Sequence, residues 1–254
     1  MKAALLAIAY NEPVFFPIWL GYYSRFFAPE DIHVIDNGST DGSIDGEGFV
    51  RIVAETSHDD RIWRTRFVEE QQHRLLQRYD CVLCVDVDEI VAPDPRAGTL
   101  GDYLDSFDRE LVNCLGYEVL HRRDSEPALD PGRPVLPQRS WWYPNPGYNK
   151  PNLASVPMRW VPGFHHSEDG RIALDPDLRL VHLHRVDFDI ALERHRTRAA
   201  RPSDPEDIAE GRGYHNRIAD PERFEHWFYN DSCFEDLGVG IEPEPIPEHW
   251  KTLV

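Results

Sequence analysis

The sequence predicts an α/β protein with a mixed, mostly parallel sheet flanked by helices. Over the first ~110 residues, short apolar segments of strand length alternate with helical patterns, which is typical of βαβ units. Polar residues follow three of the expected strands, at Asn11, Asp36 and Asp86. The carboxyl ends of parallel strands meet at the sheet edge where open α/β sheets bind ligands. The same pattern therefore predicts the fold class and the position of a ligand site.

The elements of the first half can be placed in order. Residues 4–9 form the first expected strand, and Asn11 is expected to cap a helix whose opening turn holds Pro13 and Pro17, where a missing N–H costs little. Residues 32–35 form a second strand, and the turn formers that follow it are expected to cap another helix. Residues 52–53, 65–78 and 81–85 are expected as strand, helix and strand.

The second half is less regular. Residues 111–119 read as a further strand, and a long polar, Pro-rich stretch follows to residue 162. Residues 190–199 form an amphipathic helix with Arg194, Arg196 and Arg198. We interpret these arginines as a solvated helix face, with approach to a diphosphate or to a partner as the alternative.

Composition restricts the partners. The chain has 254 residues, of which 41% are hydrophobic, and this is typical of a globular protein. Its formal net charge of -18 disfavours nucleic acid and anionic membrane surfaces as partners. An acidic protein that binds a phosphorylated substrate needs a bound cation or a few well-placed Arg and Lys side chains.

No apolar run approaches the length of a membrane span, so we expect no membrane span and a cytoplasmic location. The cysteines do not form the pattern of a disulfide framework, which agrees with a reducing setting. They are Cys81, Cys84, Cys114 and Cys233.

The segment CVLCVDVDEIV, residues 81–91, carries an apolar strand directly into acidic residues. Because side chains alternate along a strand, Asp86 and Asp88 are expected to point to the same side. Mg²⁺ and Mn²⁺ are commonly held by one or two carboxylates, with water and substrate phosphates at the other positions. The pair therefore predicts a site for one of these two ions.

Four motifs in order, AIAYNE, VIDNGSTDGS, Thr65-Arg66-Phe67 and CVDVDE, resemble the nucleotide-sugar half of GT-A glycosyltransferases of the family 2 kind, especially bacterial members. The similarity covers roughly residues 3–110, with weaker echoes to about residue 187. It implies a GT-A, Rossmann-like catalytic domain over residues 1–187, divided at residue 110 into a nucleotide-sugar half and an acceptor half. Residues 188–254 would form a helical and Pro-rich extension packed on the core.

The resemblance implies a metal-dependent, inverting glycosyltransferase of the hexosyltransferase type. It would move a sugar from a nucleotide-diphosphate donor, expected to be a UDP-sugar, to a hydroxyl group of a saccharide or lipid-linked saccharide. Bacterial polysaccharide or glycoconjugate synthesis would be its setting.

The same resemblance implies roles for individual residues. Donor binding falls to Tyr10, Asn11, Glu12, Asp36, Asn37, Arg66, Gln72 and Asp86. Many relatives have a second acid where Asn37 stands, which leaves the base identity open. Asp88 would ligate the Mn²⁺ or Mg²⁺ ion, with Asp86 facing the ribose or the metal's water shell. His184, or failing it His182, would complete the metal's ligands.

Two further groups are candidates for substrate contact. An acceptor hydroxyl must lose its proton, and Asp124, Glu168 and Asp169, which lie in polar loops, are the candidate bases. An aromatic run with nearby amide and amino groups would either contact a sugar ring or hold a long loop down. Its members are Trp141, Trp142, Tyr143, Tyr148, Asn149 and Lys150.

Two other functions remain open from the sequence. A haloacid-dehalogenase-like phosphohydrolase would use Asp86 as nucleophile and Asp88 as acid, although Ile90 stands where that class favours Thr or Val. A non-catalytic module that binds carbohydrate or metal would share the fold without turnover.

Overall fold

The computed structural model describes residues 1–54, 58–231 and 240–254. Its first half is built on four parallel strands in the order β3-β2-β1-β4. Their bounds are β1 Ala3–Ala9, β2 Ile32–Asp36, β3 Val50–Val53 and β4 Cys81–Cys84.

The second half continues this sheet beyond β4 as β8-β6-β7-β10, each strand antiparallel to its neighbour. The strand β9 pairs parallel with β6 and antiparallel with β5. The bounds are β5 Glu89–Pro93, β6 Leu111–Val119, β7 Trp141–Pro144, β8 Pro151–Ala154, β9 Leu174–His182 and β10 Glu244–Pro245.

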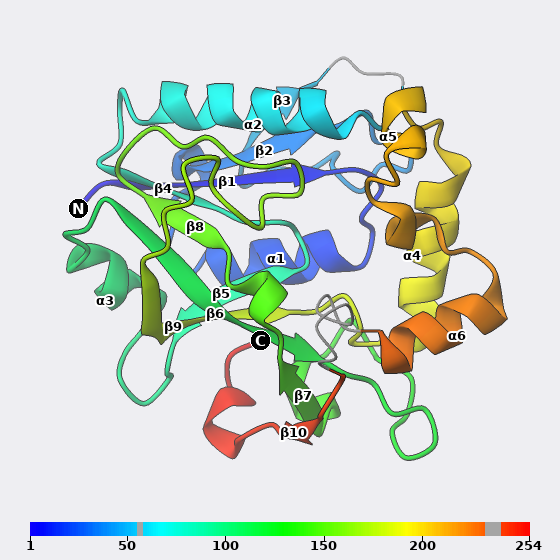
Figure 1. Ribbon diagram of the computed structural model, residues 1–254. Coiled ribbons are helices and arrows are strands. Elements are labelled where there is room, and N and C mark those ends of the chain that lie inside the picture. The colour runs from blue at the N-terminus through cyan, green and yellow to red at the C-terminus, as the bar shows by residue number, and fades with distance from the viewer. Residues whose placement is uncertain (55–57, 232–239) are drawn as a thin grey trace.

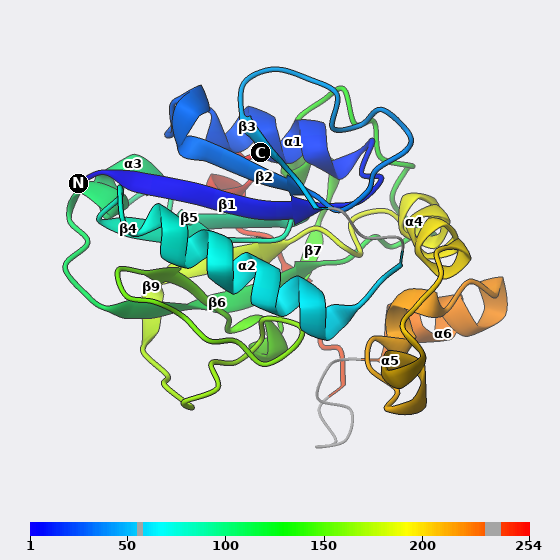
Figure 2. The same cartoon turned by 90° about the horizontal axis from the view of Figure 1, so that it is seen from above.

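Helices cover both faces of the sheet because β1 alternates between two apolar cores. Leu5 and Ala7 pack in the core that holds α1 (Phe15–Tyr23), whereas Leu6 packs in the core that holds α2 (Arg61–Leu75). Figures 1 and 2 show these two helices on opposite sides of β1. The predicted α/β class, with a large mixed sheet flanked by helices in a Rossmann-like arrangement, is confirmed. Another short helix is α3, Leu100–Asp105.

Among the described residues after residue 187 there are three α-helices and one strand. They are α4 (Phe188–Ala200), α5 (Pro205–Ala209), α6 (Pro221–Asn230) and β10. Figure 1 shows α4, α5 and α6 beyond the carboxyl end of β1, so this extension faces the predicted ligand edge. Phe188, Phe224 and Phe228 join α4 and α6 in an apolar cluster of their own.

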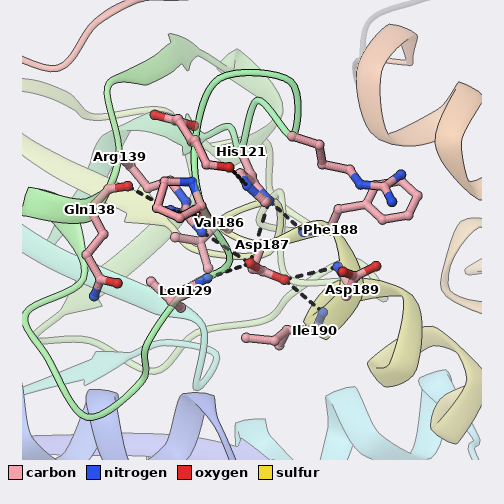
Figure 3. A network of polar contacts seen from close by, with 12 residues as sticks. His121, Leu129, Gln138, Arg139, Val186, Asp187, Phe188, Asp189 and Ile190 are labelled. Carbon is pink, nitrogen blue, oxygen red and sulfur yellow. Dashed lines mark hydrogen bonds and ion pairs between the residues drawn. The ribbon is translucent and has the colours of Figure 1, made fainter.

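The start of α4 is fixed by one buried carboxylate, Asp187, shown in Figure 3. Its Oδ1 accepts hydrogen bonds from the backbone N–H groups of Asp189 and Ile190, at 3.0 and 3.1 Å. Its Oδ2 accepts from Leu129 N at 2.8 Å and from the fully buried guanidinium of Arg139 at 3.2 Å. This cap ties the first turn of α4 to the core, and it therefore sets the position of every side chain further along the helix.

Three local predictions were wrong. Asn11 does not cap α1; its backbone is left-handed (φ 49°), and its side-chain oxygen accepts from Thr40 N at 2.8 Å. No helix follows β2, because the turn formers bond one another, with Ser39 N donating to Asp36 at 2.8 Å. The helix α2 begins four residues early, because Asp60 caps it by accepting from Trp63 N.

Short 3₁₀ turns complete the description, at Pro29–Asp31, Leu136–Gln138, Pro146–Tyr148, Tyr214–Arg217 and Glu248–Trp250. Cys233 lies outside the described residues, and the three described cysteines are free thiols. Among the helices described, none combines the length and the apolar character needed to cross a bilayer.

Candidate active site

A cavity of about 270 Å³ lies where the strands of the first half end. One side is lined by Tyr10 and Asn37, which directly follow β1 and β2, by Asp88, which stands between β4 and β5, and by the end of β9 at His182. We call this side the strand-end side. The opposite side comes from the first turns of α2, from α4 and from residues 201–217, and we call it the arginine wall. The predicted ligand edge therefore does carry a cavity.

Three buried side chains on the strand-end side converge on one point. Asp88 Oδ2 lies 3.3 Å from His182 Nε2 and 3.5 Å from His184 Nδ1. One ligand atom from each of the three residues can be chosen so that all lie within 4.8 Å of one another. This spacing lets a single ion contact all three, so Asp88, His182 and His184 form a cluster that could hold a metal.

Glu118 orients the ring of His182 for metal binding. The Nδ1 of His182 lies 2.7 Å from Glu118 Oε2, which leaves Nε2 turned toward Asp88. Burial opposes the charged imidazole, but the carboxylates of Glu118 and Asp88 outweigh it and raise the pKa of His182 to about 10. A carboxylate behind a histidine is the usual support of a metal-ligating imidazole.

His184 offers a bare nitrogen to Asp88. Behind it, His195 Nδ1 lies 3.2 Å from the backbone carbonyl of Ile218, and because a carbonyl only accepts, this nitrogen carries the hydrogen. Neutral His195 then accepts from His184 at Nε2, 2.7 Å away. Burial, together with neighbouring cationic and histidine side chains, lowers the pKa of both imidazoles, that of His195 to about 2.

The consequence is that two acceptors face each other across 3.5 Å, the Nδ1 lone pair of His184 and a carboxylate oxygen of Asp88. A cation between them removes this repulsion, so the residues present fit a divalent metal. One carboxylate and two imidazoles suit Mn²⁺ and other transition ions better than Mg²⁺, which prefers an all-oxygen shell.

Asp86 lines the cavity but lies outside this cluster. The strand β4 ends at Cys84, so the alternation that was expected to align Asp86 with Asp88 does not reach them. Instead a turn begins, in which Glu89 N donates to the carbonyl of Asp86 at 3.0 Å. The ammonium of Lys150 lies 3.0 Å from Asp86 and 2.5 Å from Glu89. Burial opposes ionisation of Asp86, but Lys150 outweighs it and lowers the pKa of this carboxyl.

The arginines of α4 reach the same cluster. Arg194 is buried and bonds both Asp88 and Glu12, and Arg198 lies 3.0 Å from Glu12. The interpretation of these arginines as a solvated face is therefore wrong for two of the three, and only Arg196 is exposed. Glu12, expected beside the nucleoside, is buried against this arginine pair instead.

The charge of the cavity is opposite to that of the chain. Asp and Glu outnumber Lys and Arg by 45 to 27 overall, but the cavity is lined by eight Arg or Lys side chains and four Asp or Glu side chains. The eight are Arg61, Arg64, Lys150, Arg194, Arg198, Arg201, Arg212 and Arg217. Most were not expected from the sequence. The spacing i, i+4, i+7 of Arg194, Arg198 and Arg201 was the available signal, because it places them on one helix face.

Two of the expected donor residues lie together at one end of the cavity. Arg201 donates to the carbonyl of Asn37 at 2.8 Å, and its guanidinium lies 4.0 Å from the ring centre of Tyr10. Asn11 and Asp36 are outside the described lining, and Asp36 pairs with Arg51.

The other two donor residues expected from the sequence, both on α2, are not in the cavity. Arg66 binds Glu69 and Glu168, at 2.9 and 2.5 Å. Gln72 is buried and donates to the carbonyl of Val156 at 3.0 Å, a contact that joins α2 to a loop. Both side chains therefore have structural partners here.

None of the three candidate bases lines the cavity. Asp124 is exposed in a loop, where it accepts from Ser125. Glu168 is bound by Arg66, and Asp169 lies 2.6 Å from Arg171. Asp124 and Asp169 contact residues of their own loops, and Glu168 is held against α2. Their position after the metal motif in the sequence therefore did not bring them to it.

The aromatic run divides in the fold. Trp142 and Tyr143 are buried, and Trp142 packs on Trp250 with ring centres 5.6 Å apart. Tyr148 and Lys150 instead line the cavity, and the Tyr148 ring lies over His182 with centres 4.0 Å apart. The run therefore mainly holds its loop to the core and offers one ring to the site.

Comparison with known proteins adds little to this geometry. No protein-family model and no curated protein matches the chain. A search of solved structures finds a mannose-1-phosphate geranyltransferase from Thermus thermophilus, which is 10% identical, with a TM-score of 0.34 over 82% of this chain and 70% of that chain. A similarity at this level supports no inference about activity, so the function is argued from the site.

Proposed function

We propose that the protein is a metal-dependent glycosyltransferase that takes a sugar from a nucleotide-diphosphate donor. The observation that carries the proposal is the meeting of a metal-competent cluster and several guanidinium groups in one cavity at the strand ends. A pyrophosphate is the ligand that needs both at once, since it carries charge that a cation and arginines neutralise.

The reaction requires charge stabilisation on the departing diphosphate when the bond to the anomeric carbon breaks. A bound Mn²⁺ supplies this as a Lewis acid. Asp88, His182 and His184 would hold this ion, and Arg194, which bonds Asp88, would offer its guanidinium to the phosphate oxygens. The nucleoside lies beside Tyr10, with UDP as the expected carrier, and the acceptor is a saccharide, free or lipid-linked. An inverted anomeric centre is the expected product.

The test is release of free nucleotide from UDP-, GDP-, CMP- and dTDP-sugars, each with Mn²⁺, with Mg²⁺ and with a chelator. The proposal expects release from one donor class that requires the metal and rises when an acceptor is added. A haloacid-dehalogenase-like enzyme would instead release phosphate from sugar phosphates, and a binding module would release nothing. Either of these results contradicts the proposal.

A further inference from the structure

We infer that the acceptor of this enzyme carries a phosphate group, which binds at a second anion subsite on the arginine wall, centred on Arg61. The inference rests on the proposed function for the identity of the ligand as an acceptor. The subsite itself rests on geometry and charge alone.

Arg61 is a buried cation that forms no ion pair with any described residue. It lines the cavity, only 7% of its surface is exposed, and its Nε has no hydrogen-bond partner. Within residues 1–54, 58–231 and 240–254, no carboxylate lies at ion-pair distance from its guanidinium. Its backbone N–H, by contrast, is held by Asp207 at 2.8 Å. A buried charge without an ion-pair partner destabilises the folded protein unless a ligand of opposite charge binds to it.

The guanidinium of Arg61 lies directly against Gly213. Gly213 has a left-handed backbone (φ 62°), and a Cβ atom there would overlap the guanidinium of Arg61. The side chain therefore lies flat against the Gly213 backbone, which holds it at the cavity surface. Only glycine allows both the backbone conformation and this contact.

Further cations surround Arg61. The pKa of Arg61 is lowered to about 10, mainly by burial and also by Arg64 and Arg198, while Asp59 and Asp207 oppose this shift. Burial, followed by Arg61, also lowers the pKa of His215, to about 3. These groups weaken one another's charged forms because they are close together, and a bound anion would relieve that repulsion.

The arginine wall exceeds what one diphosphate requires. The metal cluster and Arg194, the residue of the arginine wall that bonds Asp88, already provide for the donor's phosphates. Arg61 remains, together with Arg217, which lines the same wall and donates to the carbonyl of Arg212 at 3.2 Å. A cavity wall with several guanidinium groups suits a phosphate, whose oxygens accept from more than one donor fork, better than a single carboxylate. The second anion is therefore assigned to the acceptor.

The first experiment measures binding of inorganic phosphate by calorimetry, with UDP and Mn²⁺ present at saturation. We expect the native protein to bind phosphate under these conditions, and Arg61→Gln to weaken binding at least about 10-fold, the scale of a charge-assisted hydrogen bond. Arg74→Gln, an exposed arginine on the same helix paired with Glu70, is the matched control and should bind as the native protein does.

The results separate the two proposals. Phosphate that is excluded once UDP and Mn²⁺ are bound, or phosphate binding unchanged in Arg61→Gln, overturns the second subsite. If UDP does not bind with Mn²⁺, the proposed function and the acceptor assignment fail, while phosphate titrated alone into both proteins still decides the subsite. Arg217→Gln repeats the measurement if Arg61→Gln does not fold.

The second experiment identifies the source of the phosphate. Transfer is compared for a hexose, the same hexose phosphate and a saccharide linked to a polyprenyl diphosphate. We expect one phosphorylated acceptor to be used, and Arg61→Gln to raise its KM at least about 10-fold, while the control Arg74→Gln keeps the KM of the native protein. A neutral hexose used as well as its phosphate, with a KM unaffected by Arg61→Gln, contradicts the inference.

Discussion

The two sides of the cavity differ in how their charges are satisfied. On the strand-end side, each charged group has close partners: Asp88 is bound by Arg194 and two histidines, and Lys150 joins Asp86 and Glu89. On the arginine wall, Arg61 has no carboxylate partner among the described residues. The first side is a preorganised network into which a cation fits, whereas the second requires an anion to complete it.

The largest effect is expected from Asp88→Ala, which removes the carboxylate that joins both sides. Losing a ligand should cost more than the ~10- to 100-fold known for groups behind metal ligands, so Mn²⁺ affinity should fall by at least about 100-fold. Calorimetric titration of Mn²⁺ checks this. Asp124→Ala, on an exposed loop, is the control, and equal Mn²⁺ affinity in both variants would falsify the metal assignment.

Asp187→Ala should detach the arginine wall from the core. It removes the cap of α4 and leaves the buried Arg139 without its carboxylate, which together should lower the free energy of unfolding by about 3 kcal/mol. Urea unfolding measures the loss. Asp220→Ala removes the exposed cap of α6, which accepts from Arg223 N, and should lower the free energy of unfolding by about 1 kcal/mol. Similar losses in the two variants would show that the Arg139 contact contributes nothing.

Glu118→Gln tests the carboxylate that orients the proposed metal ligand His182. The amide can still accept from His182 Nδ1 but carries no charge, so Mn²⁺ affinity should fall about 10-fold. Manganese titration followed by electron paramagnetic resonance measures it. Glu225→Gln, on the exposed face of α6, should leave the affinity unchanged. An unaltered affinity in Glu118→Gln would show that His182 is held by packing alone.

His195→Gln should change the pH dependence of stability. Because burial lowers the pKa of His195 to about 2 from about 6.5 in the unfolded chain, only the unfolded state binds this proton between these values. Native stability is therefore complete above pH 6.5 and falls as the pH decreases. As the pH falls from 6 to 4, the free energy of unfolding of His195→Gln should decrease by about 1.4 kcal/mol less per pH unit than that of the native protein. Parallel stability curves in urea, measured without metal, would contradict this.

The sequence predicted the parallel half of the sheet, the cavity at its carboxyl ends, and two of the three cluster residues as the most favoured ligands. Alternation and local periodicity carry that information, since apolar strands and the residues directly after them are adjacent in the chain. Ion pairs between distant residues were not predicted: Glu12 is separated from Arg194 by 182 residues, and Arg66 from Glu168 by 102. No local pattern encodes such pairs.

The alternation of strands and helices in the first half followed from the sequence alone, because it depends on neighbours within a few residues. The meeting of Asp88 with His182 and His184 depends on the pairing of β5 with β9, which is a long-range contact. Only the tertiary structure decided that Asp86 turns to Lys150 and that residues 188–217 return over the strand ends with their arginines inward. Those outcomes depend on which charged side chains meet in the folded protein. A charged side chain that loses its hydration on burial needs a partner, and tertiary packing rather than sequence spacing decides which residue that is.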